Sequence, residues 1–142
     1  MPTVTQSLEI PAAPEQVWAV ATDWSRYGEW NITHSGFPKG PPTNDQGARF
    51  TERVTIMGMP GEASWTVAES SAPLRTVWTG QGPMGITLGT RLELAPTDQG
   101  TTVSISITFD GGPLAGPIGE TVARSAQRGA LESLERLRGL VA

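Results

Sequence analysis

The sequence predicts a single α+β domain in which a curved antiparallel sheet wraps around a long C-terminal helix. One observation is the order of the patterns: a strand and two short helices, then a series of strands, then one long helix. A second is the length of 142 residues, which fits one domain spanning 1–142 with a sizeable core. The third is the change from an alternation of period two to helical spacing near residue 117.

The N-terminal segment predicts one strand followed by two short helices. Polar and apolar residues alternate over Thr3–Ile10, which indicates a half-buried strand that Pro11 ends. Pro14 suits the first turn of a helix, and apolar residues then recur at helical spacing as far as Thr22. The segment that follows carries aromatic residues, namely Trp24, Tyr27 and Trp30.

The middle of the chain predicts an antiparallel meander. The segment Phe37–Gly47 is rich in glycine and proline and indicates a loop. Five segments with a period of two follow it: Arg49–Met57, Glu62–Glu69, Leu74–Thr79, Ile86–Leu94 and Thr101–Asp110. The breaks between them hold turn residues: Gly58–Gly61, Ser70–Pro73, Gly80–Gly85 and Pro96–Gly100. With the N-terminal strand, this predicts a sheet of about six strands.

The last element is predicted to be a helix from Pro117 to about Leu140. Its inner face is bulky at both ends and small in the middle: Ile118, Val122, Ser125 or Ala126, Gly129 or Ala130, Ser133 or Leu134, Leu137 and Val141. A glycine inside a helix costs about 1 kcal/mol relative to alanine. Two explanations stand side by side: a cavity lies under the helix, or the helix approaches the sheet closely and bulky strand residues fill the gap.

The composition excludes several classes of partner and site. The net charge of −4 and the pI near 4.9 disfavour nucleic acid and anionic membranes. With no cysteine, one histidine and no acidic cluster, the sequence predicts no metal site. It contains neither a signal-peptide pattern nor a run of about 20 apolar residues, so we expect a cytoplasmic protein without membrane insertion.

Two N-terminal motifs and the terminal helix resemble the START-like superfamily. The motifs are Ile10–Trp18 (IPAAPEQVW) and Asp23–Trp30 (DWSRYGEW), and the resemblance extends over essentially the whole chain. More narrowly, the chain looks like the bacterial branch of polyketide cyclase/dehydrase and lipid transport proteins. Further segments are similar to an actinobacterial subgroup, some of whose members are described as toxins of type II toxin-antitoxin pairs: Trp30–His34, Met57–Pro60, Trp65–Thr66 and Gly111–Gly119.

The resemblance implies a helix-grip fold around a hydrophobic cavity that binds a small polyketide- or lipid-like molecule and needs no cofactor. Three functions stay open: a polyketide cyclase/dehydrase, a carrier or sensor without catalysis, and a toxin whose partner is an antitoxin protein. Whether the chain is a monomer or a homodimer is also open. The residues expected to line the cavity are Trp30, Phe50, Val54, Trp65, Trp78, Leu88, Ile105, Val122, Ala126, Gly129 and Ser133.

Glu52 is the first candidate for chemistry. It alternates with Phe50 and Val54, so its carboxylate falls on the apolar face of a strand. Burial there would raise its pKa and suit it to general acid or base catalysis of an enolisation or dehydration. The alternatives are pairing with Arg53 or Arg91, or a register that exposes the carboxylate.

His34 is the second candidate, as the only histidine of the chain. It lies just after the aromatic segment, where a proton shuttle at the mouth of the cavity is one role. The alternative is a surface or loop residue with a hydrogen-bonding role. Alternation places Arg49, Arg53 and Arg91 on the solvent face of their strands.

Overall fold

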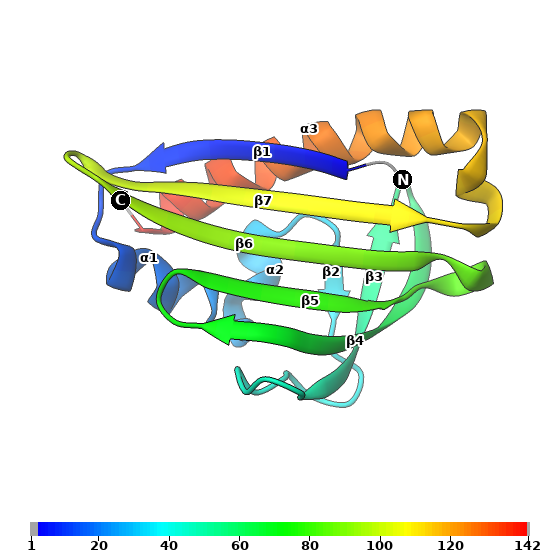
Figure 1. The fold of residues 1–142 in the computed structure, drawn as a ribbon, viewed down its shortest axis with the longest axis horizontal. Coiled ribbons are helices and arrows are strands. Elements are labelled where there is room, and N and C mark those ends of the chain that lie inside the picture. The colour runs from blue at the N-terminus through cyan, green and yellow to red at the C-terminus, as the bar shows by residue number, and fades with distance from the viewer. Residues whose placement is uncertain (1–2, 142) are drawn as a thin grey trace.

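The computed structural model describes residues 3–141 and shows the predicted α+β architecture. A single antiparallel sheet curls around one long helix, α3 (Pro117–Val141), and two shorter helices lie at one end of the sheet (Figure 1). No helix among the described residues is long and apolar enough to cross a membrane.

The sheet has seven strands rather than about six. They are β1 (Thr3–Ile10), β2 (His34–Gly36), β3 (Arg49–Ile56), β4 (Met59–Ser71), β5 (Arg75–Gln81), β6 (Thr87–Thr97) and β7 (Gly100–Asp110). Their order across the sheet is β1-β7-β6-β5-β4-β3-β2. The extra strand is β2, whose three residues are too few to produce a detectable alternation.

The predicted meander is confirmed, but several strands begin or end elsewhere. The predicted break at Gly58–Gly61 exists but is shorter and starts one residue earlier, since β4 already begins at Met59. Met57 and Gly58 form the turn between β3 and β4, with φ values of 53° and 80°. Positive φ at both positions is the geometry that matches the twist of a hairpin, so two residues suffice to reverse the chain. At the other end of the meander β6 continues through Pro96 to Thr97.

The N-terminal helices follow the prediction closely. Helix α1 (Pro14–Ala21) begins with its proline in the first turn, and the Gln16 side chain accepts a hydrogen bond from the Ala13 amide at 3.2 Å. A 3₁₀ turn, η1 (Trp24–Arg26), leads into α2 (Tyr27–Trp30). Two further 3₁₀ turns are η2 (Pro83–Gly85) and η3 (Gly112–Ala115).

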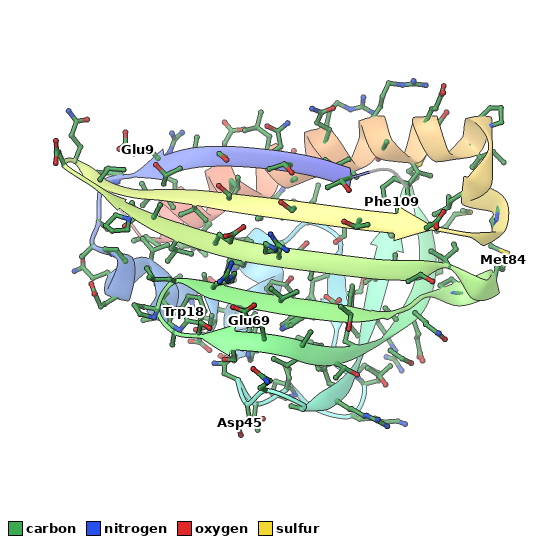
Figure 2. The ribbon with its side chains drawn as sticks, in the orientation of Figure 1. Glu9, Trp18, Asp45, Glu69, Met84 and Phe109 are labelled. Atoms are coloured by element: carbon green, nitrogen blue, oxygen red, sulfur yellow. The ribbon has the colours of Figure 1, made fainter. Side chains whose placement is uncertain are left out.

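The core divides into two clusters along α3. The main cluster joins α1, α2 and the C-terminal half of α3 to the sheet, and it contains Trp18, Trp24, Tyr27, Trp30, Trp65, Trp78, Leu134 and Leu137 among others. The smaller cluster lies under the N-terminal half of α3 and is built on Val4, Ile86 and Phe109. Figure 2 shows Trp18 at the α1 end of the molecule and Met84 at the opposite end.

The inner face of α3 differs from the prediction at its N-terminal end. The surroundings of Gly129 explain why a small residue lies at the middle of this face. Ala130, Leu134 and Leu137 are buried as expected, but Ile118 is 59% exposed, so its assignment to the inner face is wrong. A Cβ atom on Gly129 would lie 3.3 Å from Cδ1 of Ile32, in the turn between α2 and β2. The missing side chain at Gly129 therefore makes room for Ile32.

Candidate functional site: a buried His34–Glu52 pair

The Glu52 side chain lies on the inner face of β3 and is 4% exposed. Each of its carboxylate oxygens has a partner. The indole Nε1 of Trp65 donates to Oε1 at 2.9 Å, and Nδ1 of His34 lies 2.7 Å from Oε2. Two contacts of this kind offset much of the cost of burying a carboxylate, which would be large for an unpaired group.

Glu52 does not pair with an arginine. Arg53 forms an ion pair with Glu62 at 3.7 Å, and Arg91 forms one with Glu93 at 3.6 Å. Arg49, Arg53 and Arg91 are all exposed, as alternation predicts.

The His34 side chain is buried in strand β2 rather than lying in a loop, with 7% of its surface exposed. Its backbone pairs with Val54 of β3, and a register shift follows before Gly36 pairs with Arg53. This pairing turns the imidazole toward the inward-facing Glu52. The two residues proposed for catalysis from separate arguments are therefore in direct contact.

Aromatic rings surround this polar pair. The His34 ring lies 4.8 Å from Tyr27 and 4.5 Å from Phe37, measured between centroids. Phe50 and Trp65 lie 4.6 Å and 5.9 Å from Trp78, which links them to the rest of the cluster. Sequence reasoning missed Phe37, although its position three residues after His34 was the available signal.

Burial raises the pKa of Tyr27 well above its ordinary value of 10.0, and the negative charge of Glu52 raises it further. Tyr27 is consequently a neutral phenol at physiological pH. In the tautomer of His34 that carries its proton on Nδ1, this N–H donates to Glu52 Oε2, and the other ring nitrogen, Nε2, carries no proton.

Trp30 adds a further polar feature to the interior. Its Nε1 is buried and has no hydrogen-bond partner among the described residues, although Trp30 is only 2% exposed. By contrast, Nε1 of Trp24 donates to Asn44 Oδ1 at 2.9 Å. An unpaired buried donor costs about 1–3 kcal/mol, so the Trp30 indole would gain from an acceptor supplied by a bound molecule.

The residues predicted to line a cavity fall into two groups. Trp30, Trp65, Trp78, Ile105 and Ser133 are buried in or beside the main cluster. The others are only half-buried: Phe50, Val54, Leu88, Val122, Ala126 and Gly129. Leu88, Val122 and Ala126 pack against the smaller cluster and keep part of their apolar surface exposed.

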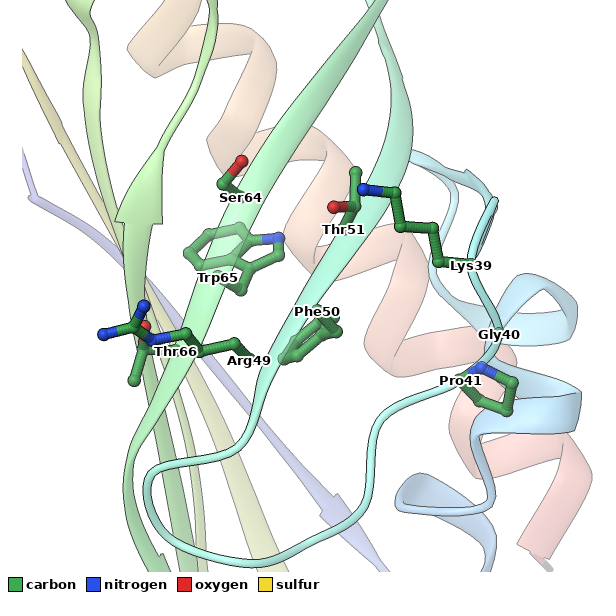
Figure 3. Close-up of a pocket in the computed structure, with 9 residues that line it drawn as sticks. All are labelled: Lys39, Gly40, Pro41, Arg49, Phe50, Thr51, Ser64, Trp65 and Thr66. Atoms are coloured by element: carbon green, nitrogen blue, oxygen red, sulfur yellow. The ribbon is translucent and has the colours of Figure 1, made fainter.

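Two hollows lie along β3 and β4. The larger measures about 470 Å³ and is lined by Lys39, Gly40, Pro41, Arg49, Phe50, Thr51, Ser64, Trp65 and Thr66 (Figure 3). The smaller measures about 270 Å³ and includes Val54. Neither is lined by α3. The larger one includes two predicted residues, Phe50 and Trp65.

A metal centre finds no support in the geometry. Within residues 3–141, no three histidine, aspartate or glutamate side chains come together in a way that would hold a metal ion. His34 and Glu52 form a pair with Trp65, whose indole nitrogen is a donor and not a ligand.

Comparison with known proteins identifies relatives of similar length. Toxin Rv0910 from Mycobacterium tuberculosis is 31% identical over 136 residues, covering 95% of this chain and 94% of that protein. An uncharacterised protein of the same organism, Rv1546, is 28% identical over 141 residues, covering 99% of both chains.

Solved structures show the same fold at lower sequence identity. A START superfamily protein from Mycobacterium smegmatis superposes with a TM-score of 0.74 at 22% identity, covering 98% of this chain and 96% of the other. A conserved protein from Geobacillus kaustophilus gives 0.78 at 15% identity, covering 99% and 95%. The family model described as polyketide cyclase/dehydrase and lipid transport matches residues 1–142. Since these structures show that the fold is shared, and the family model spans the chain, the chain belongs to the polyketide cyclase/dehydrase and lipid transport family.

Proposed function

We propose that this protein binds a small hydrophobic or aromatic molecule between α3 and the sheet, and that His34 and Glu52 move protons on it without a cofactor. The observation that carries the proposal is the 2.7 Å contact between His34 Nδ1 and Glu52 Oε2, buried among aromatic rings. A structural role alone would not require the only histidine of the chain to lie beside a buried carboxylate.

The binding part of the proposal rests on the apolar surface under α3. Leu88, Val122 and Ala126 are half-buried, and the unpaired Nε1 of Trp30 supplies a donor for a carbonyl or hydroxyl oxygen. A mostly apolar site with few polar groups is typical of small-molecule binding. The family description, which names polyketides and lipids, supports the same class of ligand.

The catalytic part follows from the tautomer that Glu52 favours. Nε2 of His34 removes a proton from a carbon next to a carbonyl group, and the electron pair moves into the carbonyl to give an enolate. The ionised Glu52 stabilises the imidazolium that forms. The imidazolium then returns its proton to a departing hydroxyl in a dehydration, or to the new alkoxide in a ring closure. Most of the rate enhancement would come from holding the chain in a bent conformation.

The binding step is tested with N-phenyl-1-naphthylamine, whose fluorescence rises in an apolar site. We expect saturable binding by the wild-type protein, and native mass spectrometry of the protein from its host should show a co-purifying small molecule. If neither is observed, the binding proposal fails, and the catalytic proposal fails with it.

The catalytic step is tested with 4-phenyl-2-butanone in D₂O, by following exchange of the protons next to its carbonyl by NMR. We expect exchange above the buffer rate in the wild-type protein, and a loss of about 100-fold or more in His34→Gln. Glu52→Gln should bind the probe but lose exchange, because an amide at this position favours the His34 tautomer protonated on Nε2. Probe binding without exchange in the wild type would favour a carrier or sensor.

A toxin function is the second candidate, because a relative that covers nearly the whole chain is named a toxin. Under this alternative the outer surface acts, and the partner is an antitoxin protein. Growth arrest on induced expression, relieved by an adjacent small reading frame, would support it. Arrest that persists in the His34→Gln variant would separate it from the enzymatic proposal.

A further inference from the structure

The sheet has two edges, and one of them is only partly covered. At the β1 edge, α3 lies beside the strand, and Nε2 of Gln6 donates to the carbonyl oxygen of Gln127 at 3.1 Å. At the other edge, β2 covers β3 for only three residues, and its last residue, Gly36, pairs with Arg53. Pro38 follows two residues later and has no N–H to continue the ladder. Within residues 3–141, the part of β3 before Arg53 therefore has no neighbouring strand on this side.

The backbone of this open stretch presents hydrogen-bonding groups to the outside. The Thr55 amide donates to the Thr33 carbonyl oxygen at 2.9 Å, so the N–H and C=O groups of Thr55 face β2. The register between β3 and β4 is constant from Arg49 to Ile56, and the direction of these groups alternates along a regular strand. The N–H and C=O groups of Arg49 and Thr51 therefore face the open edge, where they have no backbone partner among the described residues.

The larger hollow lies along this open edge. Arg49 and Thr51 line it from β3, and the loop residues Lys39, Gly40 and Pro41 line its other side (Figure 3). Its volume of about 470 Å³ gives room for a short extended segment, which would lie about 4.8 Å from the strand with which it pairs. Unpaired backbone groups beside such a space are a template for an added strand.

Two basic side chains flank the open edge. The chain has a net charge of −4, yet Lys39 and Arg49 form no ion pair with the carboxylates of residues 3–141. Their charged ends are directed to opposite sides of β3 and β4, so they do not converge on one anion (Figure 3). Consecutive side chains of an extended peptide also point to opposite sides. Two acidic residues at an odd spacing in an added strand would therefore meet one basic side chain each.

We propose that the open edge of β3 binds an extended acidic segment of a partner protein, which joins the sheet as an additional strand beside Arg49 and Thr51. The backbone of the segment pairs with the N–H and C=O groups of these two residues, and its acidic side chains pair with Lys39 and Arg49. In such complexes the backbone supplies affinity and the side chains supply specificity. The loop on the far side of the hollow favours a single extended chain over the edge of a second folded sheet. Binding at this edge is independent of the proposed function, because neither His34 nor Glu52 lines the hollow.

The probe is the peptide acetyl-TVEVTDVT-amide, whose two acidic residues lie at an odd spacing. Amide hydrogen exchange of the ¹⁵N-labelled protein, followed by NMR, reports on the backbone contacts directly. At saturating peptide we expect exchange of the Arg49 and Thr51 amides to slow by about tenfold or more, because both N–H groups gain an acceptor. The amides of Phe50 and Glu52 already face β4, so their exchange should not change.

Control peptides separate the contribution of the backbone from that of the charges. The neutral peptide acetyl-TVQVTNVT-amide keeps the backbone and should bind about tenfold more weakly, because it lacks both ion pairs. Two further versions of the acidic peptide carry N-methyl groups on alternate residues, one version for each alternate set. The version methylated on the set whose N–H groups face β3 should lose binding, because it cannot pair with the strand.

Variants of the protein test the same contacts from the other side. Thr51→Pro removes one N–H from the open edge and no hydrogen bond to β4, whereas Thr51→Val keeps the N–H. We expect Thr51→Pro to bind the acidic peptide about tenfold more weakly and Thr51→Val to bind it as the wild type does. Lys39→Met and Arg49→Met should each lose about threefold in affinity. The matched control is Arg53→Met, which should lose none, because Arg53 already pairs with Glu62.

Thermal unfolding checks that each variant folds, and the exchange and peptide measurements on the wild type decide the question even where Thr51→Pro does not fold. Three results would overturn the proposal: unchanged exchange at Arg49 and Thr51, equal binding of the acidic peptide and both N-methylated versions, or equal binding of the acidic and neutral peptides. Slow exchange of these two amides without peptide, increasing with protein concentration, would also overturn it and would assign the edge to a second copy of the chain. N-phenyl-1-naphthylamine binding and ketone exchange do not report on this edge, so failure here is distinguishable from failure of the proposed function.

Discussion

The partners of the Glu52 carboxylate connect three separate segments of the chain. His34 comes from β2, Glu52 from β3 and Trp65 from β4, and each contact is shorter than 3 Å. Hydrogen bonds to an ionised group are stronger than those between neutral groups, and they are stronger still in a water-poor interior. The same two contacts thus also tie β2, at the edge of the sheet, and β4 to β3.

Removal of the Glu52 carboxylate should destabilise the folded protein. Glu52→Ala leaves the Trp65 indole and His34 Nδ1 without their acceptor and creates a void, so we expect a loss of about 2–4 kcal/mol in the free energy of unfolding. Glu52→Gln keeps the shape and should cost about 1 kcal/mol. Urea unfolding measures both. The control is Glu62→Ala, an exposed carboxylate on β4, which should change stability by less than about 0.5 kcal/mol. Equal effects at both positions would contradict this account.

Burial of the Tyr27 hydroxyl leads us to expect that the protein loses stability at alkaline pH. Burial raises the pKa of its hydroxyl in the folded protein, whereas in the unfolded chain the hydroxyl ionises near pH 10. Above about pH 10 the unfolded chain releases a proton that the folded protein keeps, so stability falls as the pH rises. Below about pH 10 the hydroxyl is protonated in both states, so its contribution to stability does not change with pH. Tyr27→Phe should lose this dependence, and unfolding at pH 8 and pH 11 for both proteins compares the slopes. If the wild-type protein and Tyr27→Phe lose the same stability between pH 8 and pH 11, folding does not raise the pKa of the Tyr27 hydroxyl.

At the scale of elements, β2 and α3 show how small local features position the site. Strand β2 has only three residues, yet it brings His34 beside Glu52 and forms the edge of the sheet. The turn before it places Ile32 against Gly129 of α3, and the amide of Ile32 donates to Ser133 Oγ at 3.1 Å. The small residues of α3 therefore hold this turn in position, which answers part of the question that the helix pattern left open.

The two glycines of α3 should respond differently to alanine. A Cβ on Gly139 meets nothing within 4 Å, so Gly139→Ala should raise stability by about 1 kcal/mol through helix propensity. At Gly129 the Cβ would be 3.3 Å from the tip of the Ile32 side chain, so part of that gain is lost in moving it. Thermal unfolding measures the difference. In an Ile32→Val background, which removes the contacting methyl group, Gly129→Ala should recover the full gain. If Gly129→Ala still stabilises less than Gly139→Ala in this background, contact with the Ile32 side chain is not the cause of the lost stability.

At the scale of the whole molecule, the core divides into two clusters that Leu88 joins. The main cluster is rich in tryptophan and packs against α1 and α2, while the smaller one has half-buried Leu88, Val122 and Ala126 at its margin, where we propose that the ligand binds. The exposed methionines Met57, Met59 and Met84 occur in or beside turns at strand ends away from α1. Flexible thioethers at such positions suit an adaptable rim around a binding site.

A bulky residue on α3 tests the proposed position of the ligand. Ala126→Phe would place a ring among Leu88 and Val122, where we propose that the ligand lies, so binding of N-phenyl-1-naphthylamine should fall at least about tenfold while the fold remains intact. The control is Arg128→Phe, two residues further along the helix and exposed. Fluorescence titration gives the affinity, and circular dichroism checks the fold. Undiminished binding in Ala126→Phe would move the binding site away from this part of α3.

The sequence by itself determined the order of the elements and the face on which most side chains lie. Alternation predicted that Glu52 points inward and that Arg49, Arg53 and Arg91 point outward, because a strand repeats every two residues wherever it lies in the fold. Proline positions predicted the starts of α1 and α3. Only the tertiary structure decided that His34 contacts Glu52, 18 residues away, that Ile32 fills the space at Gly129, and that Lys39 and Arg49 share a hollow. Such contacts depend on loop paths and on the register between strands, including the shift in β2, which no local period encodes.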